Sequence, residues 1–231
     1  MRYDCLLLDA DGTLLDCDQA EGLALRDTFA QFGQPYDHDV LSLYREINGE
    51  MWRAIERGEL SESELPVARF VRLGQVLGLD LNPREFGPAY LEQLGQHGES
   101  LPQTDEVLAA LHGRVSMVLV TNGLQRVQSS RLARATITRY LDAVVISGEE
   151  GLAKPDPRVF EIALQRAGNP PRDRVLMVGD SLTADIAGGH NAGIDTCWYN
   201  PAALPRDPRY EPVHEIRELR ELIALVTGEG A

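Results

Sequence analysis

The sequence predicts an α/β fold, in which a core with a Rossmann-like parallel sheet carries a helical bundle inserted after the first strand. Short apolar runs alternate with amphipathic helical patterns, which is typical of a parallel sheet with helices on both faces. The interval 17–96 interrupts this alternation because it contains helical patterns and no strand-like run. Acidic residues follow two of the apolar runs, at the strand ends where open α/β sheets place their ligand site.

The core elements are expected in a regular order. The strands are expected at 3–8, 115–120, 143–146, 174–178 and 194–199, and the helices between them at 104–112, 124–135, 157–167 and 183–191. Asp156 and Pro157 suit the N-cap and first turn of one helix, and Gly168 suits its C-terminal end. A proline-rich stretch, 201–212, precedes a last helix expected at 213–226.

The helical insertion predicts two domains. Its four expected helices are 21–32, 39–57, 63–77 and 83–94, separated by turns that contain glycine. We therefore expect a core domain built from residues 1–16 and 97–231, and a helical cap domain built from residues 17–96. A chain of 231 residues is long enough to bury a substantial hydrophobic core.

Composition restricts the classes of partner. The formal net charge of −14 argues against binding of nucleic acid, whose phosphates need clustered lysine and arginine. A small phosphorylated substrate remains compatible, because a metal ion, one lysine and backbone amides can hold a single phosphate. No apolar run approaches the ~18 residues of a membrane span, and no signal-peptide pattern precedes the first strand. We expect a cytoplasmic monomer or homodimer without membrane contact.

The first acidic motif is DADGT, at residues 9–13. Alternating strand geometry places Asp9 and Asp11 on the same side of the chain as the strand ends. Gly12 permits a sharp turn there, and the hydroxyl of Thr13 can tie that turn. A DxD spacing is common in surface loops, so its position directly after a buried strand is what makes it a candidate site.

Two further segments place polar residues near strand ends. The run 115–120 continues into Thr121 and Asn122, whose hydroxyl and backbone amides could bind a phosphoryl group or simply cap the next helix. Lys154 lies in the loop 151–155 (GLAKP). It is either a solvated loop lysine or a cation that neutralises a nucleophile and a phosphate together.

A second acidic motif completes the set. Asp180 follows an apolar run, and Asp185 lies early in the next helix, so both can face the same cavity as Asp9. Carboxylates are hard oxygen ligands, which favours Mg²⁺. Asp185 alone could instead interact with the helix dipole. All these motifs in one order indicate a site more strongly than any one of them.

The order of the motifs, DxDGT, TNG, a loop lysine and GDSxxxD, resembles the haloacid dehalogenase superfamily of phosphohydrolases across the whole core. The helical insertion is similar to that superfamily's C1 cap. The segments 145–155 and 167–200 resemble bacterial pyrimidine 5′-nucleotidases, including those that act on noncanonical nucleotides. Residues 48–60 are similar more loosely, and the first motif reads DADGT where those nucleotidases have DADET.

This resemblance implies a Mg²⁺-dependent phosphomonoester hydrolase with an aspartyl-phosphate intermediate, acting on pyrimidine nucleoside monophosphates as a 5′-nucleotidase. Asp9 would attack phosphorus and Asp11 would exchange the proton. The implied catalytic residues are Asp9, Asp11, Thr121 and Lys154, the implied phosphate ligands are Asp9, Thr121, Asn122 and Lys154, and the implied metal ligands are Asp9, Asp11 through its carbonyl, Asp180 and Asp185. Asn48, Met51 and Trp52 are candidates for leaving-group recognition, although apolar residues at this helical spacing are more often part of a core.

Three alternatives stay open. A mutase or a phosphatase of small sugar phosphates or phosphoglycolate would share the same core residues. A haloacid dehalogenase needs neither a metal nor an acid two residues after the nucleophile, so Asp11 and Asp180 argue against it. A regulator that binds phosphate without turnover is disfavoured because the catalytic set is intact.

Overall fold

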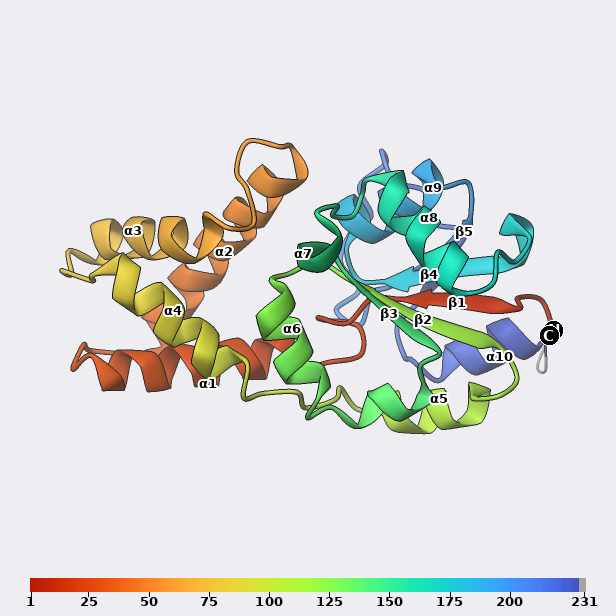
Figure 1. Cartoon of the computed structure of the whole chain (residues 1–231), viewed down its shortest axis with the longest axis horizontal. Coiled ribbons are helices and arrows are strands. Elements are labelled where there is room, and N and C mark those ends of the chain that lie inside the picture. Colours follow the sequence, from red (N-terminus) through yellow and green to blue (C-terminus); the bar gives the residue numbers. More distant parts are fainter. Residues whose placement is uncertain (229–231) are drawn as a thin grey trace. The chain divides into compact units, whose positions relative to one another are not determined.

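A computed structural model of the chain describes residues 1–228, and Figure 1 labels its elements. The chain divides into two compact units. The first contains Met1–Asp16, Glu99–Asn122 and the chain from Ala135 onward, and the second contains Cys17–Gly98 and Gly123–Arg134. The segment Gly123–Arg134 thus groups with the helical insertion, although the sequence assigned it to the core. The expected core domain ran to residue 231, and residues 229–231 lie outside the described part.

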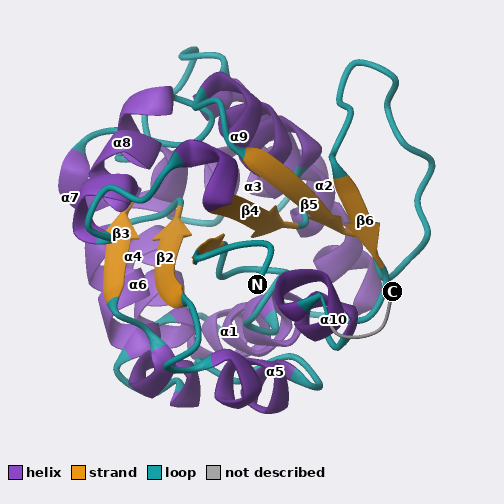
Figure 2. Ribbon diagram, turned by 90° about the vertical axis from the view of Figure 1, so that its right-hand side faces the viewer, coloured by secondary structure: helices purple, strands orange, loops and turns teal. Residues whose placement is uncertain are grey.

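The first unit contains a parallel sheet that, within residues 1–228, has six strands in the order β3-β2-β1-β4-β5-β6 (Figure 2). The strands are β1 (Cys5–Leu8), β2 (Ser116–Thr121), β3 (Ala143–Ile146), β4 (Val175–Gly179), β5 (Asp195–Tyr199) and β6 (His214–Ile216). All five expected strands are present, which confirms the predicted fold class. The chain runs from β1 outward to β3 and then returns to the other side of β1, so the topological switch point lies between β1 and β4.

Helices cover both faces of this sheet. Figure 1 shows α8 and α9 on one face and α5 and α10 on the other. The helices of the first unit are α5 (Thr104–Leu111), α7 (Ser147–Glu150), α8 (Pro157–Arg166), α9 (Ala187–Asn191) and α10 (Glu221–Thr227). Asp156 accepts a hydrogen bond from the Arg158 backbone as the predicted N-cap of α8. The helix expected at 183–191 begins instead as a π-helical turn, Leu182–Ile186, before α9.

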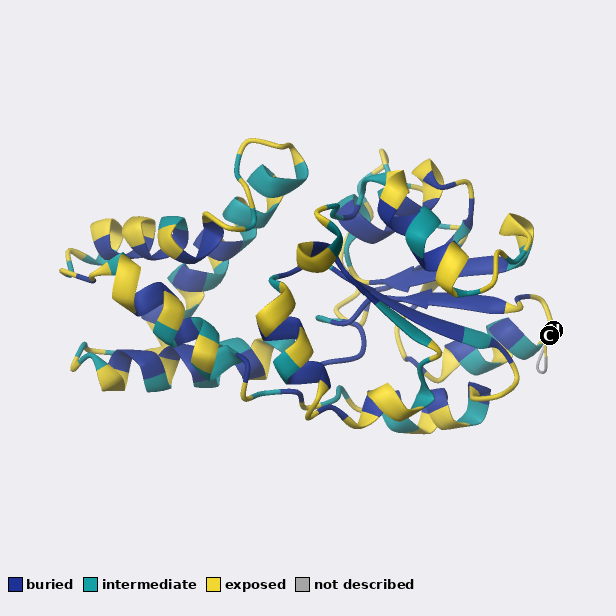
Figure 3. Cartoon of the chain, viewed as in Figure 1, coloured by how far each residue is buried: buried dark blue, intermediate teal, exposed yellow. Residues whose placement is uncertain are grey.

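The sheet is buried along nearly its whole length, as the dark blue strands in Figure 3 show. Alternate residues of each strand face opposite sides. Cys5 and Leu7 pack with Val118 and with Val159 and Phe160 of α8. Full burial of a side chain of this kind contributes about 1.5–3 kcal/mol, so the sheet gives the strand ends a rigid base.

The prediction of a last helix at 213–226 is wrong in its first half. His214–Ile216 forms β6, which pairs in parallel with β5, and α10 begins only at Glu221. Contacts distant in sequence hold this strand in place. The Tyr3 hydroxyl lies 2.6 Å from Asp195 Oδ2 and 2.9 Å from His214 Nε2. A local apolar pattern cannot report such contacts.

His214 should make stability depend on pH. Burial lowers the pKa of His214, as does the charge of Arg2, while Asp195 opposes the change. The folded protein then binds fewer protons at His214 than the unfolded chain does, so this residue's contribution to stability is lost as pH falls below about 6.5. We expect the Tm of the parent to fall more between about pH 8 and about pH 5 than the Tm of His214→Gln falls. Thermal unfolding at the two pH values measures both changes. A difference in Tm between the two proteins that is independent of pH would contradict this expectation.

The second unit is helical. It contains α1 (Cys17–Gln31), α2 (His38–Glu56), α3 (Leu65–Leu77), α4 (Pro83–Leu94) and α6 (Gln125–Leu132). An aromatic cluster forms its core. The ring centroid of Phe86 lies 5.0 Å from that of Phe29 and 4.9 Å from that of Phe70, and the centroids of Tyr44 and Tyr90 are 5.4 Å apart. All four helices expected in the insertion are present. Among the described residues, no helix is long and apolar enough to cross a bilayer.

Candidate active site

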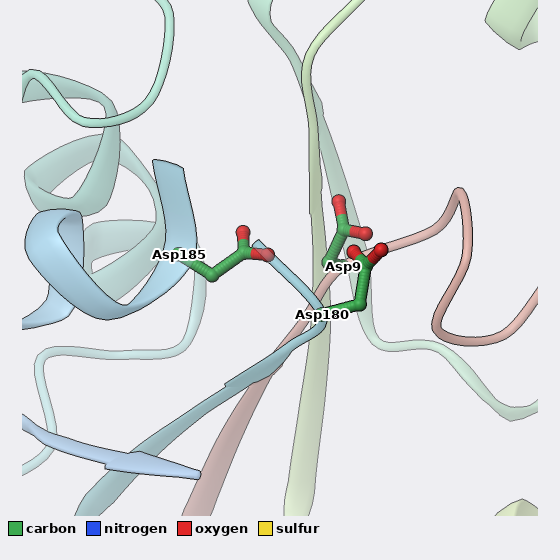
Figure 4. A group of neighbouring side chains, drawn as sticks. All are labelled: Asp9, Asp180 and Asp185. Atoms are coloured by element: carbon green, nitrogen blue, oxygen red, sulfur yellow. The ribbon is translucent and has the colours of Figure 1, made fainter. Parts of the chain in front are cut away.

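Two adjacent strands place the first carboxylates. Asp9 directly follows β1, and its backbone N–H donates to the carbonyl of Val178 at 3.0 Å, which extends the pairing of β1 with β4 by one residue. Asp180 directly follows β4. Because the two strands are parallel neighbours, their carboxyl ends lie together, and so do the side chains of Asp9 and Asp180 (Figure 4).

Asp185 joins them from the π-helical turn after β4. Asp9, Asp180 and Asp185 each offer a carboxylate oxygen within 4.8 Å of the other two (Figure 4). Asp9 and Asp185 are buried, whereas Asp180 is exposed and gives the cluster access to solvent. The carboxylate of Asp11 does not belong to this cluster, so its implied role as a metal ligand rests on its backbone carbonyl alone and stays a prediction.

Lys154 is the internal counter-charge of the cluster. Its Nζ lies 2.5 Å from Asp9 Oδ1 and 2.7 Å from Asp185 Oδ1, and the side chain is only 2% exposed. It is therefore not a solvated loop lysine. Lys154 is also the only lysine among the 22 lysine and arginine residues of the sequence, a signal that the motif analysis missed.

The electrostatics indicate a shortage of positive charge. Burial, together with the charge of Asp185, raises the pKa of Asp9 to about 7 against the opposing effect of Lys154. Desolvation and the charges of Asp9 and Asp185 raise the pKa of Asp180, and because Asp180 is exposed we attribute more of this to the charges. Burial alone would lower the pKa of Lys154, but its two carboxylate partners raise it.

A divalent cation fits this set of residues. Three carboxylates and one ammonium leave a formal charge of −2, which one such cation would neutralise. The atoms that would bind the cation are all carboxylate oxygens, the hard ligands that Mg²⁺ prefers. Asp9, Asp180 and Asp185 would hold the ion, and the exposed Asp180 leaves room for water in the remaining positions.

The turn after β1 fixes the orientation of Asp9. Gly12 has a φ of +82°, and the Thr13 hydroxyl donates to Asp9 Oδ2 at 3.2 Å. The hydroxyl therefore binds the carboxylate, whereas the sequence suggested only that it ties the turn. With Lys154 on Oδ1 and Thr13 on Oδ2, both oxygens of Asp9 have a donor.

Asp185 is held as tightly as Asp9. The backbone N–H of Ser181 donates to Asp185 Oδ2 at 3.0 Å, while Lys154 holds Oδ1. A Cβ atom at Gly179 would overlap the Asp185 carboxylate, so only glycine fits there. These contacts identify Asp185 as part of the cluster, beyond any interaction with the helix dipole.

Thr121 and Asn122 do not cap a helix. Thr121 is the buried last residue of β2, and α6 begins only at Gln125. Asn122 directs its side chain to the backbone of Lys154. The capping alternative considered from the sequence is therefore wrong, and the phosphate-binding role of the two residues stays a prediction.

Trp198 is a residue of this site that the sequence did not indicate. Its side chain is buried on β5, and Nε1 donates to the backbone carbonyl of Asp180 at 2.8 Å. We expect Trp198→Phe to keep most of the packing, to release that carbonyl, and to weaken Mg²⁺ affinity by about tenfold, as loss of an outer contact usually does. Isothermal titration with Mg²⁺ measures this affinity. Parent affinity in the variant would show that the indole does not position Asp180.

The cap candidates lie on α2. Asn48 is buried and both ends of its amide are engaged, since Nδ2 donates to Glu21 Oε1 at 2.8 Å and Oδ1 accepts from Arg69 Nη1 at 3.1 Å. Met51 packs against the aromatic core, and Trp52 is half-buried. Their roles in recognising a leaving group stay predictions.

A buried carboxylate with two hydrogen-bond donors thus belongs to an acidic cluster that could hold a cation, at the switch point of a parallel sheet, where open α/β sheets bind their ligands. The family model of haloacid dehalogenase-like hydrolases matches residues 3–193, and the chain belongs to this family. The resemblance inferred from the motifs is thereby confirmed.

Relatives of similar length agree with this assignment. The chain is 33% identical to the pyrimidine 5′-nucleotidase YjjG of Escherichia coli, over 98% of this chain and 99% of that protein. It is 35% identical to the pyrimidine 5′-nucleotidase PynA of Streptococcus pneumoniae, over 96% and 94% of the two chains. A crystal structure of the HAD-hydrolase YfnB of Bacillus subtilis, bound to magnesium, matches with a TM-score of 0.92 and 33% identity, over 98% of this chain and 99% of that one.

Proposed function

We propose that the protein is a Mg²⁺-dependent phosphatase that hydrolyses pyrimidine nucleoside 5′-monophosphates through an aspartyl-phosphate at Asp9. The observation that carries the chemistry is the Asp9 carboxylate, held by Lys154 and Thr13 within the acidic cluster that could bind a cation. Identity over nearly the full chain to two pyrimidine 5′-nucleotidases supports the substrate class.

The first displacement transfers the phosphoryl group to the protein. A carboxylate oxygen of Asp9 attacks phosphorus, the ester P–O bond breaks, and Asp11 gives a proton to the departing 5′-oxygen of the nucleoside. Asp9, the Asp11 carbonyl, Asp180 and Asp185 would hold Mg²⁺, which would supply positive charge to offset the repulsion between the carboxylate and the phosphate. Thr121, the backbone amide of Asn122 and Lys154 bind the remaining phosphate oxygens.

The second displacement releases phosphate. Asp11, now ionised, takes a proton from a water molecule that attacks the phosphorus of the aspartyl-phosphate, and the bond to Asp9 breaks. Inorganic phosphate leaves and the Asp9 carboxylate is restored. Lys154 stays beside Asp9 in both steps, so the carboxylate returns to the same position for the next cycle.

A panel of phosphomonoesters tests the substrate. Purified protein with Mg²⁺ is assayed for phosphate release from UMP, dUMP, CMP, AMP, ribose 5-phosphate and phosphoglycolate. We expect kcat/KM for the pyrimidine nucleotides to exceed that for the sugar phosphate by at least about tenfold, as contacts to a base allow. Equal rates would overturn the nucleotidase assignment and leave the phosphatase, whereas no phosphate release from any ester would overturn both.

Dehalogenation is tested in the same preparation. We expect no halide release from a 2-haloalkanoic acid, because Asp9, Asp180 and Asp185 form an acidic cluster that could hold a cation, which such a displacement does not need. Halide release at a rate comparable to the best phosphate release would favour the alternative.

A further inference from the structure

A single side chain holds the backbone that carries Lys154. Asn122 Nδ2 donates to the carbonyl of Lys154 at 3.0 Å, and the backbone N–H of Lys154 donates to Asn122 Oδ1 at 2.9 Å. One amide thus satisfies both backbone polar groups of one residue, as paired residues do in an antiparallel sheet. Two such bonds fix the direction of the Lys154 backbone as well as its position.

The ammonium of Lys154 depends on this anchoring. A lysine side chain has a flexible four-carbon stem, so its charge is held in one place only if its backbone is also held in place. Here the ammonium must reach Asp9 at 2.5 Å and Asp185 at 2.7 Å at the same time. A small shift of the loop would lose one contact or both.

The use of lysine at this position is specific. The other 21 basic residues of the chain are all arginine, since 22 lysine and arginine residues include one lysine. A compact ammonium fits between two carboxylates, whereas a planar guanidinium is larger and binds in a fork. The space between the two carboxylates therefore suits a compact ammonium, and the position of that ammonium depends on the position of the Lys154 backbone.

We propose that the Asn122 side chain is a positioning residue, which keeps the Lys154 ammonium between the nucleophile Asp9 and Asp185. This role is separate from that of the Asn122 backbone amide, which the proposed function assigns to phosphate and which Asn122→Ala leaves in place. The kinetic consequence rests on the proposed function, while the structural consequence does not.

The chain offers a matched control in Asn191, at the end of α9. Asn191 Nδ2 donates to the carbonyl of Pro155, the residue after Lys154, at 3.2 Å. Its side chain is exposed, and its hydrogen bond to the loop goes to Pro155 rather than to Lys154. Asn191→Ala removes an asparagine from the same loop without removing the anchor of Lys154.

A double-mutant cycle tests the kinetic consequence. Asn122→Ala should lower kcat for the best phosphomonoester by about 10- to 100-fold with KM changed less than about threefold, since misplacement of a charged group by about 1 Å costs this much. Lys154→Met should lower kcat by about 10²- to 10³-fold, and adding Asn122→Ala to it should change kcat less than about threefold. Asn191→Ala should stay near the parent. Independent effects that multiply in the double variant would overturn the proposal.

An amine reagent tests the structural consequence without any substrate. Because the chain has one lysine, acetylation by an N-hydroxysuccinimide ester, followed by peptide mass spectrometry, reports on Lys154 alone, apart from the terminal amine. We expect Lys154 to react at least about tenfold faster in Asn122→Ala than in the parent, because release of the loop exposes a buried amine. Asn191→Ala should react like the parent. Equal rates in the parent and Asn122→Ala would overturn the proposal.

The two experiments separate this proposal from the proposed function. If the parent hydrolyses no phosphomonoester, the proposed function fails while the labelling rates still decide the role of Asn122. If Asn122→Ala does not fold, Asn122→Asp replaces it in both experiments. That variant keeps an acceptor for the Lys154 N–H and loses the donor to the Lys154 carbonyl, so smaller changes in the same direction are expected, and parent behaviour would overturn the proposal.

Discussion

Replacement of Asp9 by asparagine should reduce phosphatase turnover by at least about 10⁴-fold, because an amide oxygen is a weak nucleophile and cannot form an acyl phosphate. The carboxamide has nearly the same shape, so the buried position should tolerate it. Steady-state phosphate release at saturating Mg²⁺ measures the effect, and circular dichroism checks the fold.

Asp4 supplies the control for this substitution. It lies next to the other end of β1, with a side chain about half exposed at 52%, and pairs with Arg174 at the surface. Asp4→Asn should therefore leave turnover within about twofold of the parent, because exposed ion pairs contribute little. If Asp9→Asn retains turnover within about tenfold of the parent, the covalent mechanism is wrong.

Lys154→Met should give the second large effect, on activity and on stability together. Without the ammonium, Asp9 and Asp185 stay buried beside each other with no internal cation. Removal of one partner from a buried ion pair costs about 3–5 kcal/mol, and protonation of a carboxylate will absorb part of this. Urea unfolding in EDTA measures the loss, and Mg²⁺ should restore more stability to the variant than to the parent.

Arg158 provides the comparison for Lys154. It is four residues away, its side chain is 70% exposed, and it pairs with Asp156 at the surface. Arg158→Met should change the free energy of unfolding by less than about 1 kcal/mol, as exposed pairs do. A Lys154→Met variant as stable in EDTA as the parent would show that the buried carboxylates do not depend on this lysine.

Most of the fold could be predicted from the sequence because its signals are local. Apolar runs such as 143–146 and caps such as Asp156 act over a few residues, and both were located correctly. The strand β6 was missed because three residues are too few to show an alternating apolar pattern, and because its position depends on contacts with Tyr3 and on pairing with β5. The π-helical turn at 182–186 follows from the contacts of Asp185, which periodicity also does not report.

The site was predicted in part for the same reason. Asp9, Asp180, Asp185 and Lys154 follow strand ends or lie in a short loop, and the sheet topology then brings them together. The contact of Trp198 with the Asp180 carbonyl and that of the Asn122 side chain with Lys154 join segments 18 and 32 residues apart. Motif spacing contains no information about them. The single lysine was visible in the composition and would have distinguished Lys154 from a surface residue.

The most direct test of the mechanism is the site of phosphoryl transfer. The protein is mixed with Mg²⁺ and a pyrimidine nucleoside monophosphate carrying ³²P, quenched in acid within a single turnover, and digested for peptide mapping. We expect the label on the peptide that contains Asp9, and none in Asp9→Asn. Label on a different residue, or product release in the parent with no labelled peptide at any time, would contradict the account.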